Sequence, residues 1–156
     1  MSISWSDLHF TPNTHAIHSL ATAWQWRLPN GFTPVLFSIL GDMFFQEATE
    51  EVYWLNTGTG EVTRVAESID HFQALIATPA ADEWFMPYLV EQLHAAGKIP
   101  TTDQCYTYVT LPIYEAGNYD VDNLNPVPAS EHFAATGELL EQIGELKVGD
   151  RGKDTD

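Results

Sequence analysis

Apolar residues near the start of the chain recur with the period of a helix. They are Ile17, Leu20, Trp24 and Leu28. This spacing places them on one helical face, and Pro29 followed by Asn30 and Gly31 ends the helix. The same helix carries His15 and His18 one turn apart. A closed zinc site needs three or four ligands and no third one lies nearby in sequence, so a metal site is not favoured.

Between Thr33 and Glu67 the apolar runs become short and rich in β-branched and aromatic residues, which predicts strands. Gly41 joins two such runs, PVLFSIL and DMFFQ, and EVYWLNTGTGEVTRVAES predicts a hairpin around its glycines. The G-T-G of that turn fits neither phosphate-binding fingerprint, because the remaining motif residues are missing and a strand follows. We therefore expect a hairpin tip there and no nucleotide site.

Helical patterns return after Ser68, which is placed to cap a helix. Thr78 followed by Pro79 predicts the start of another helical segment, which Gly97 ends. Pro87 interrupts the hydrogen-bond ladder of that segment. The sequence therefore predicts either a kink or two consecutive helices there.

Residues 104–112 alternate well enough to predict a further strand, and a last helix begins near Ser130. Gly137 lies inside this helix, where glycine costs about 1 kcal/mol relative to alanine. We therefore expect another backbone to approach the helix closely at Gly137.

Strands in the first half followed by helices predict an α+β fold. With 156 residues, 44% of them hydrophobic, the chain is long enough to bury one core. We expect one compact domain over residues 1–146, with a helical N-terminal part in residues 1–40. Residues 147–156 hold a single apolar side chain, Val148, and predict a disordered tail.

Acidic residues dominate the charge: 22 Asp and Glu stand against 6 Lys and Arg, a net charge of −16. Between Val65 and Leu146 the only basic residue is Lys98. Such a surface repels nucleic acid and anionic membranes and accelerates encounter with a basic partner. Solubility alone explains the same composition equally well.

The single cysteine, Cys105, excludes an internal disulfide and a cysteine-rich zinc site. The N-terminus shows no signal-peptide pattern, and no stretch approaches the length of a membrane span. Both observations predict a cytoplasmic protein.

The stretch YDVDNLNPVPASEHF, residues 119–133, has some features of a calcium loop. Asp120, Asp122 and Glu131 stand at positions 1, 3 and 12 of such a loop. Leu124 and Asn125 occupy positions 5 and 6, which require an oxygen ligand and a glycine. An extended segment leading into the last helix is the better interpretation.

No catalytic signature is present: the chain contains no G-x-S-x-G, no H-E-x-x-H and no cysteine in a recognisable nucleophile motif. Carboxylate pairs are frequent, but in an acidic chain they are not specific. We therefore expect no enzymatic activity, no cofactor and no metal. A small-molecule sensor remains the alternative, and a hydrolase a less favoured one.

Several short elements between Gly41 and Leu146 carry a family resemblance. They are GDMFFQ, VYWLNTGTGEV, Phe72 with Trp84, Leu89 and Val90, Gly97 with Lys98, QCYTY, YDVDNLNPVPASEHF, Gly137 and EQI. Together they resemble the C-terminal domain family of immunity proteins that protect bacteria against type VI secretion DNase effectors. They are also similar to the broader SUKH (SMI/KNR-like) immunity group.

The resemblance implies an α+β domain with a mainly antiparallel sheet packed with helices, no catalysis, and binding of a cognate protein toxin. We expect carboxylates to face Lys and Arg in a nuclease cleft, with an exposed aromatic as anchor. The candidates are Asp120, Asp122, Glu50 and Glu51 for the carboxylates, and Tyr119 or Trp54 for the aromatic. For each carboxylate plain solvation is the competing interpretation, and for Trp54 it is a place in the core. A homodimer is possible.

Overall fold

A computed structural model describes the backbone of residues 3–114 and 117–155 and the side chains of residues 3–114 and 117–144. Its centre is a five-stranded antiparallel sheet in the order β1-β2-β3-β4-β5. The strands are β1 (His9–Phe10), β2 (Thr33–Ser38), β3 (Met43–Gln46), β4 (Val52–Leu55) and β5 (Val62–Ala66). A second sheet pairs β6 (Gln104–Tyr108) with β7 (Leu124–Pro128).

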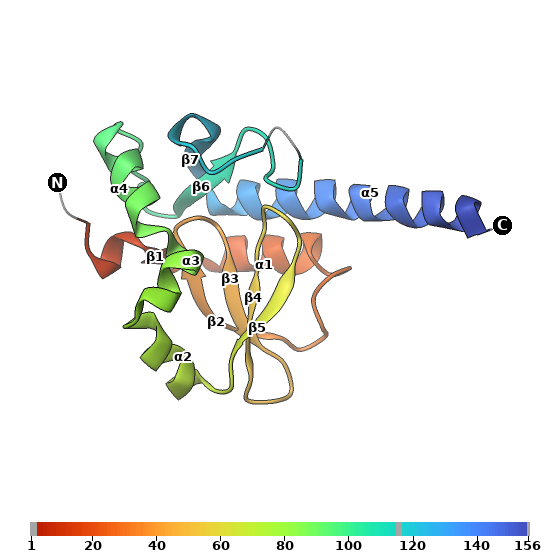
Figure 1. Ribbon diagram of the computed structural model, residues 1–156, viewed down its shortest axis with the longest axis horizontal. Coiled ribbons are helices and arrows are strands. Elements are labelled where there is room, and N and C mark those ends of the chain that lie inside the picture. Colours follow the sequence, from red (N-terminus) through yellow and green to blue (C-terminus); the bar gives the residue numbers. More distant parts are fainter. Residues whose placement is uncertain (1–2, 115–116, 156) are drawn as a thin grey trace.

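Helices cover this framework, as Figure 1 shows. They are α1 (Thr14–Ala23), α2 (Ile69–Ile76), α3 (Asp82–Phe85), α4 (Pro87–Ala95) and α5 (Ala129–Thr155). Three 3-10 helices join them: η1 (Trp5–Asp7), η2 (Pro79–Ala81) and η3 (Val121–Asn123). The prediction of one α+β domain with a mainly antiparallel sheet is confirmed. None of the helices within these backbone ranges is both long and apolar enough to cross a membrane.

The two faces of the main sheet bury different side chains, because alternate residues of a strand point to opposite faces. Met43 and Phe45 of β3 belong to the larger core cluster, together with Leu20 of α1. Phe44, between them in sequence, belongs to the second cluster, where it packs against Phe72 of α2. One strand therefore links the two clusters.

The first helix is shorter than its sequence pattern predicts. The Asn13 side chain caps α1 by accepting the N–H of Ala16, and the helix ends at Ala23. The carbonyl of Trp24 then accepts the N–H groups of both Arg27 and Leu28. This turn buries Leu28 although it lies outside the helix. The helical spacing of apolar side chains therefore continues beyond the residue at which the helical backbone ends.

Local signals of caps and breaks are confirmed further along the chain. Ser68 caps α2 by accepting the N–H of His71 at 3.1 Å. The helical segment before Gly97 is divided at Met86, the residue before Pro87, into α3 and α4. A proline disfavours helical backbone at the residue before it, and Met86 adopts φ 45° and ψ 59°. Of the two predicted outcomes, two consecutive helices are observed.

The last helix packs side by side with α1. A Cβ atom at Gly137 would lie 2.6 Å from the carbonyl oxygen of Ala23, so the predicted close approach of a backbone is confirmed. The helix extends to Thr155, across residues predicted to form a disordered tail. Extending a helix adds one hydrogen bond for each residue fixed, so a helix anchored at one end continues beyond its packed part. In Figure 1 its C-terminal part projects from the body.

Candidate functional site

The loop that carries Asp120 and Asp122 is held in place from within. We call residues 118–123 the η3 loop. The side-chain nitrogen of Asn123 donates to the carbonyl oxygens of Thr110 at 2.8 Å and Asn118 at 2.7 Å, and its side-chain oxygen accepts the N–H of Thr110 at 2.9 Å. The Asn118 side chain accepts the N–H of Asp120 at 3.1 Å. Asn123 is buried, whereas Asp120 and Asp122 are exposed, so a buried amide fixes a loop that presents two carboxylates.

Lys98 also anchors this loop. Its Nζ donates to the carbonyl oxygens of Val121 at 2.8 Å and Leu124 at 3.0 Å. The ammonium group is thus bound to backbone oxygens. No ion pair reaches Asp120 or Asp122 among the side chains that the structure describes, and their negative charges are left for solvent or a partner.

Tyr119 is the second residue of the same loop. It is half-buried, and its ring packs edge-on against Tyr108 with ring centres 5.9 Å apart. Burial raises the pKa of its hydroxyl above the ordinary value. Three residues predicted to contact a partner, Tyr119, Asp120 and Asp122, therefore lie together on one loop.

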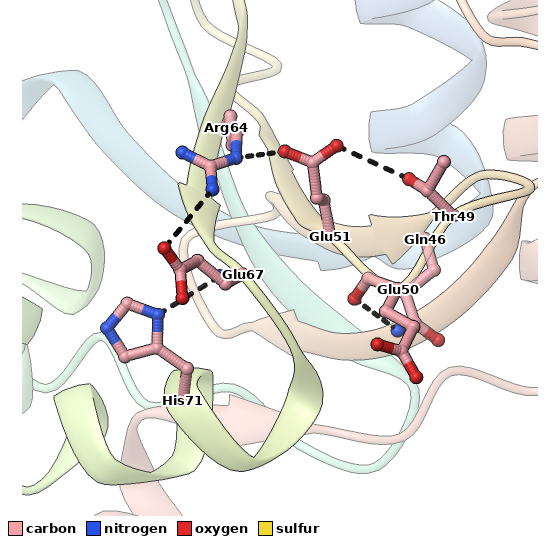
Figure 2. A network of polar contacts seen from close by, with 7 residues as sticks. All are labelled: Gln46, Thr49, Glu50, Glu51, Arg64, Glu67 and His71. Carbon is pink, nitrogen blue, oxygen red and sulfur yellow. Dashed lines mark hydrogen bonds and ion pairs between the residues drawn. The ribbon is translucent and has the colours of Figure 1, made fainter.

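The other predicted contact residues lie elsewhere. Glu50 and Glu51 follow β3, and Figure 2 shows their surroundings. Arg64 of β5 pairs with Glu51 through Nε, and its Nη2 lies 3.9 Å from a carboxylate oxygen of Glu67. The Gln46 side chain donates to the backbone carbonyl of Glu50 at 2.8 Å. Unlike the η3 loop, this acidic region contains its own cation.

Trp54 of β4 is half-buried and has a structural partner. Its indole N–H donates to Oδ2 of Asp42 at 3.1 Å, and its ring stacks on Phe44 with centres 6.4 Å apart. The alternative interpretation of Trp54, a place in the core, fits these contacts better than a role as an exposed anchor.

Asp42 belongs to a buried cluster that the sequence analysis missed. We call Gly41, Asp42, Thr57, Thr107 and His132 the polar junction. Oδ1 of Asp42 accepts the backbone N–H of Thr57 at 2.9 Å and lies 3.0 Å from its hydroxyl. His132 Nε2 lies 2.9 Å from the same hydroxyl and 3.1 Å from the carbonyl oxygen of Gly41.

These contacts assign the protons of His132. A carbonyl oxygen can only accept, so Nε2 carries hydrogen and donates toward Gly41, and Nδ1 accepts from the Thr107 hydroxyl at 2.7 Å. Burial lowers the pKa of His132 to about 4, which keeps the ring neutral near pH 7. Burial also raises the pKa of Asp42 to about 6, despite the hydrogen bonds from Thr57 and Trp54.

The polar junction has the composition of a catalytic site but not its accessibility. Asp42 is 3% exposed, Thr57 0% and His132 1%. A reacting atom needs hydrogen-bond distance to such groups, and these are enclosed in the core. We therefore assign the cluster a structural role: it joins the start of β3, the β4–β5 turn, β6 and α5. One sequence signal could have indicated it, namely Asp42 beside Gly41 within an otherwise apolar run.

A metal site needs converging ligands, and a small-molecule site needs an apolar hollow. No group of three His, Cys, Asp or Glu side chains suitable for a metal converges within residues 3–114 and 117–144. Cys105 is buried, and burial raises its pKa far above the ordinary value, so it is a weak nucleophile. The hollows at β1–β2 and at β2–α2 have volumes near 300 and 310 Å³ and open to solvent.

Comparison with known proteins places the chain in a family. The family model described as "T6SS immunity protein Tdi1, C-terminal" matches residues 66–148. That range contains the η3 loop, α4 and the packed part of α5, and it begins at Ala66, the last residue of β5. No curated protein matches the chain. Because the match covers more than half of the 156 residues, the chain belongs to the family of type VI secretion system immunity proteins related to the C-terminal part of Tdi1.

Proposed function

We propose that this chain is a non-catalytic immunity protein that silences a nuclease toxin by placing the η3 loop against the toxin's nucleic-acid-binding surface. Family membership gives the coarser role, neutralisation of a toxin. The nuclease and the acidic contact are the proposal. A nuclease holds phosphates with Lys and Arg, and a surface of carboxylates complements such a cleft.

The observation that carries the proposal is that no cation with a described side chain pairs with Asp120 or Asp122. Three Lys and Arg side chains lie in the part of the chain with described side chains. Arg27 donates to the carbonyl of Gly60, Lys98 donates to the carbonyls of the η3 region, and Arg64 pairs with glutamates after β3 and β5. Both aspartates on the η3 loop are thus available to a cation of a partner.

Glu50, Glu51 and Trp54 are left out of the proposed contact. Glu50 is next in sequence to Glu51, in the region after β3 that contains the cation of Arg64. Glu51 already has a cation in Arg64, so a partner would have to replace an existing ion pair. The indole N–H of Trp54 is bonded to Asp42. The expected anchor beside the two aspartates is instead Tyr119, which shares their loop.

The test uses the full chain as bait in lysate of its native host, at low and at high salt. The captured toxin is identified by mass spectrometry, purified, and assayed for cleavage of DNA and RNA with and without the wild-type chain. We expect the chain to abolish cleavage. We expect the double variant Asp120→Asn/Asp122→Asn to bind the toxin about tenfold more weakly at low salt, with a smaller deficit at high salt because salt screens exposed charges.

A matched control removes two charges from exposed residues after β3, as Glu47→Gln/Glu50→Gln, and should bind like the wild type. A toxin that the chain neutralises but that cleaves no nucleic acid would refute the nuclease part. Equal binding by the η3-loop double variant and the wild type would refute the proposed contact surface.

A further inference from the structure

A surface groove adjoins the η3 loop at the junction of α3 and α4. We call it the junction groove. It has a volume of about 360 Å³. The residues that matter here are Asp82, Met86, Pro87, Tyr88, Leu89 and Tyr119. Tyr119 belongs to both the groove and the η3 loop, so the two features form one continuous surface.

The backbone break at Met86 shapes this groove. Left-handed backbone is uncommon for a residue other than glycine, and here Pro87 disfavours the ordinary helical conformation at Met86. The break ends α3 and starts α4, which places Tyr88 in the first turn of a new helix. Tyr88 is 72% exposed although its ring is largely apolar. Exposed tyrosines of this kind are common anchors in protein interfaces.

The packing of η3 on α4 fixes the groove relative to the acidic loop. The two elements are in contact, and Lys98, three residues beyond the end of α4, holds the carbonyls of Val121 and Leu124. The apolar floor and the aspartates of the η3 loop therefore keep a constant relative position. A partner can contact both without ordering a mobile segment, which lowers the entropic cost of binding.

The charge around the junction groove indicates what kind of segment binds there. Most of the residues that line the groove are apolar or aromatic, and the exposed Asp82 lines it too. Tyr119, which also lines the groove, is next in sequence to the exposed Asp120 of the η3 loop. We propose that the junction groove binds an apolar anchor side chain of the toxin, flanked by Lys or Arg residues that face Asp82 and the η3 loop. This inference rests on the proposed function, since it names the toxin segment that the same surface recognises.

Other occupants fit less well. A second copy would bring a net charge of −16 against an equal charge, which opposes association. The phosphates of a nucleic acid would be repelled by the carboxylates of Asp82 and the η3 loop. The apolar hollow between β2 and α2 has Trp5, Ile69 and Phe72 in its lining but no acidic residue, so charge gives no indication of what would cover it.

The experiment measures binding of the purified toxin, identified as above, by titration calorimetry to the wild type and two single variants. We expect Tyr88→Ala to raise Kd about thirtyfold, as for an interface hot spot, and Asp82→Asn to raise it about fivefold at low salt. Matched controls are Tyr114→Ala, an exposed tyrosine outside the groove, and Asp70→Asn, an exposed aspartate in the first turn of α2. Both controls should leave Kd within twofold.

Three results would overturn the inference, and they are distinguishable. If the wild type binds and inhibits the toxin while Tyr88→Ala binds equally well, the groove is not the contact and the proposed function stands. If the wild type itself fails to inhibit any captured toxin, the proposed function fails too. If the chain sediments as a dimer that Tyr88→Ala dissociates, the groove is an interface between copies. Circular dichroism of each variant confirms folding.

Discussion

Asp42 in the polar junction and Asp120 in the η3 loop are aspartates in opposite environments. The carboxylate of Asp42 is buried and accepts hydrogen bonds from Thr57 and Trp54, whereas that of Asp120 is exposed and has no ion pair among the described side chains. The buried one joins segments of the core, and its removal should cost stability. The exposed one adds little to stability and is available to a partner. The number of carboxylates alone therefore says little about function.

The largest effect on the junction is expected from Gly41→Ala. A Cβ atom there would overlap the imidazole of His132, and Gly41 has φ +88°. Left-handed backbone costs alanine about 1 to 2 kcal/mol, and overpacking a core costs about 1 to 3 kcal/mol more. We expect the free energy of unfolding in urea to fall by about 3 kcal/mol.

Gly31→Ala is the matched control, because Gly31 has φ +75° but no atom within 4 Å of the added Cβ. It should lose only the backbone part, about 1 kcal/mol. Equal losses for the two variants would show that contact with His132 adds nothing.

The next effect concerns pH and is measured as the difference in unfolding free energy between Asp42→Asn and the wild type. Burial raises the folded-state pKa of Asp42 from 3.8 to about 6. The folded state thus binds the Asp42 proton more tightly than the unfolded state does. The resulting gain in the free energy of unfolding is present below pH 4 and is lost as pH rises through 6. Asparagine does not titrate, so the stability of the variant relative to the wild type should rise by about 2 kcal/mol between pH 4 and pH 7.

His132 changes the wild-type profile in the opposite sense. Its folded-state pKa is lowered from 6.5 to about 4. The stability of its neutral form is present above pH 6.5 and lost as pH falls through 4. The wild type should therefore vary little in this range, while Asp42→Asn loses stability as pH falls. A pH-independent difference between the two proteins would contradict the burial of an ionising Asp42.

Sequence patterns predicted the parts of this molecule that depend on neighbours along the chain. The cap at Ser68 and the break before Pro87 are confirmed because each follows from local geometry. The close approach at Gly137 is confirmed because a glycine inside a helix indicates it, although the sequence did not identify the partner, Ala23. The two-residue strand β1 was missed because it is too short to show a period. The pattern of Leu28 extended α1 too far because a buried turn can continue a helical spacing.

The polar junction could not be predicted in the same way. His132 reaches Thr57 across 75 residues and Gly41 across 91, and no local pattern specifies such pairs. The η3 loop was singled out because Asp120, Asp122 and Glu131 have part of the spacing of a calcium loop, a pattern that is visible along the chain. The junction groove was not, because Tyr88 joins Tyr119 only when α4 packs beside η3.

The smallest effect is expected where acidic residues have their own cation. Glu51 pairs with Arg64 at a site where the two side chains are 35% and 49% exposed (Figure 2). Solvent screens such pairs, and exposed pairs contribute about 0.2 to 1 kcal/mol. We expect Glu51→Gln to change the unfolding free energy by about 0.5 kcal/mol or less and the Kd for the toxin by less than about twofold, near the resolution of calorimetry.

Arg64→Gln is the informative companion variant. It leaves Glu51 and Glu67 without their cation, so the region after β3 comes to resemble the η3 loop in charge. If uncompensated carboxylates attract the toxin wherever they lie, this variant should accelerate association at low salt. If toxin binding instead requires carboxylates beside the junction groove, Arg64→Gln should leave the Kd for the toxin unchanged. A loss of toxin binding on Glu51→Gln comparable to that of Asp120→Asn/Asp122→Asn would move the contact surface to β4 and β5.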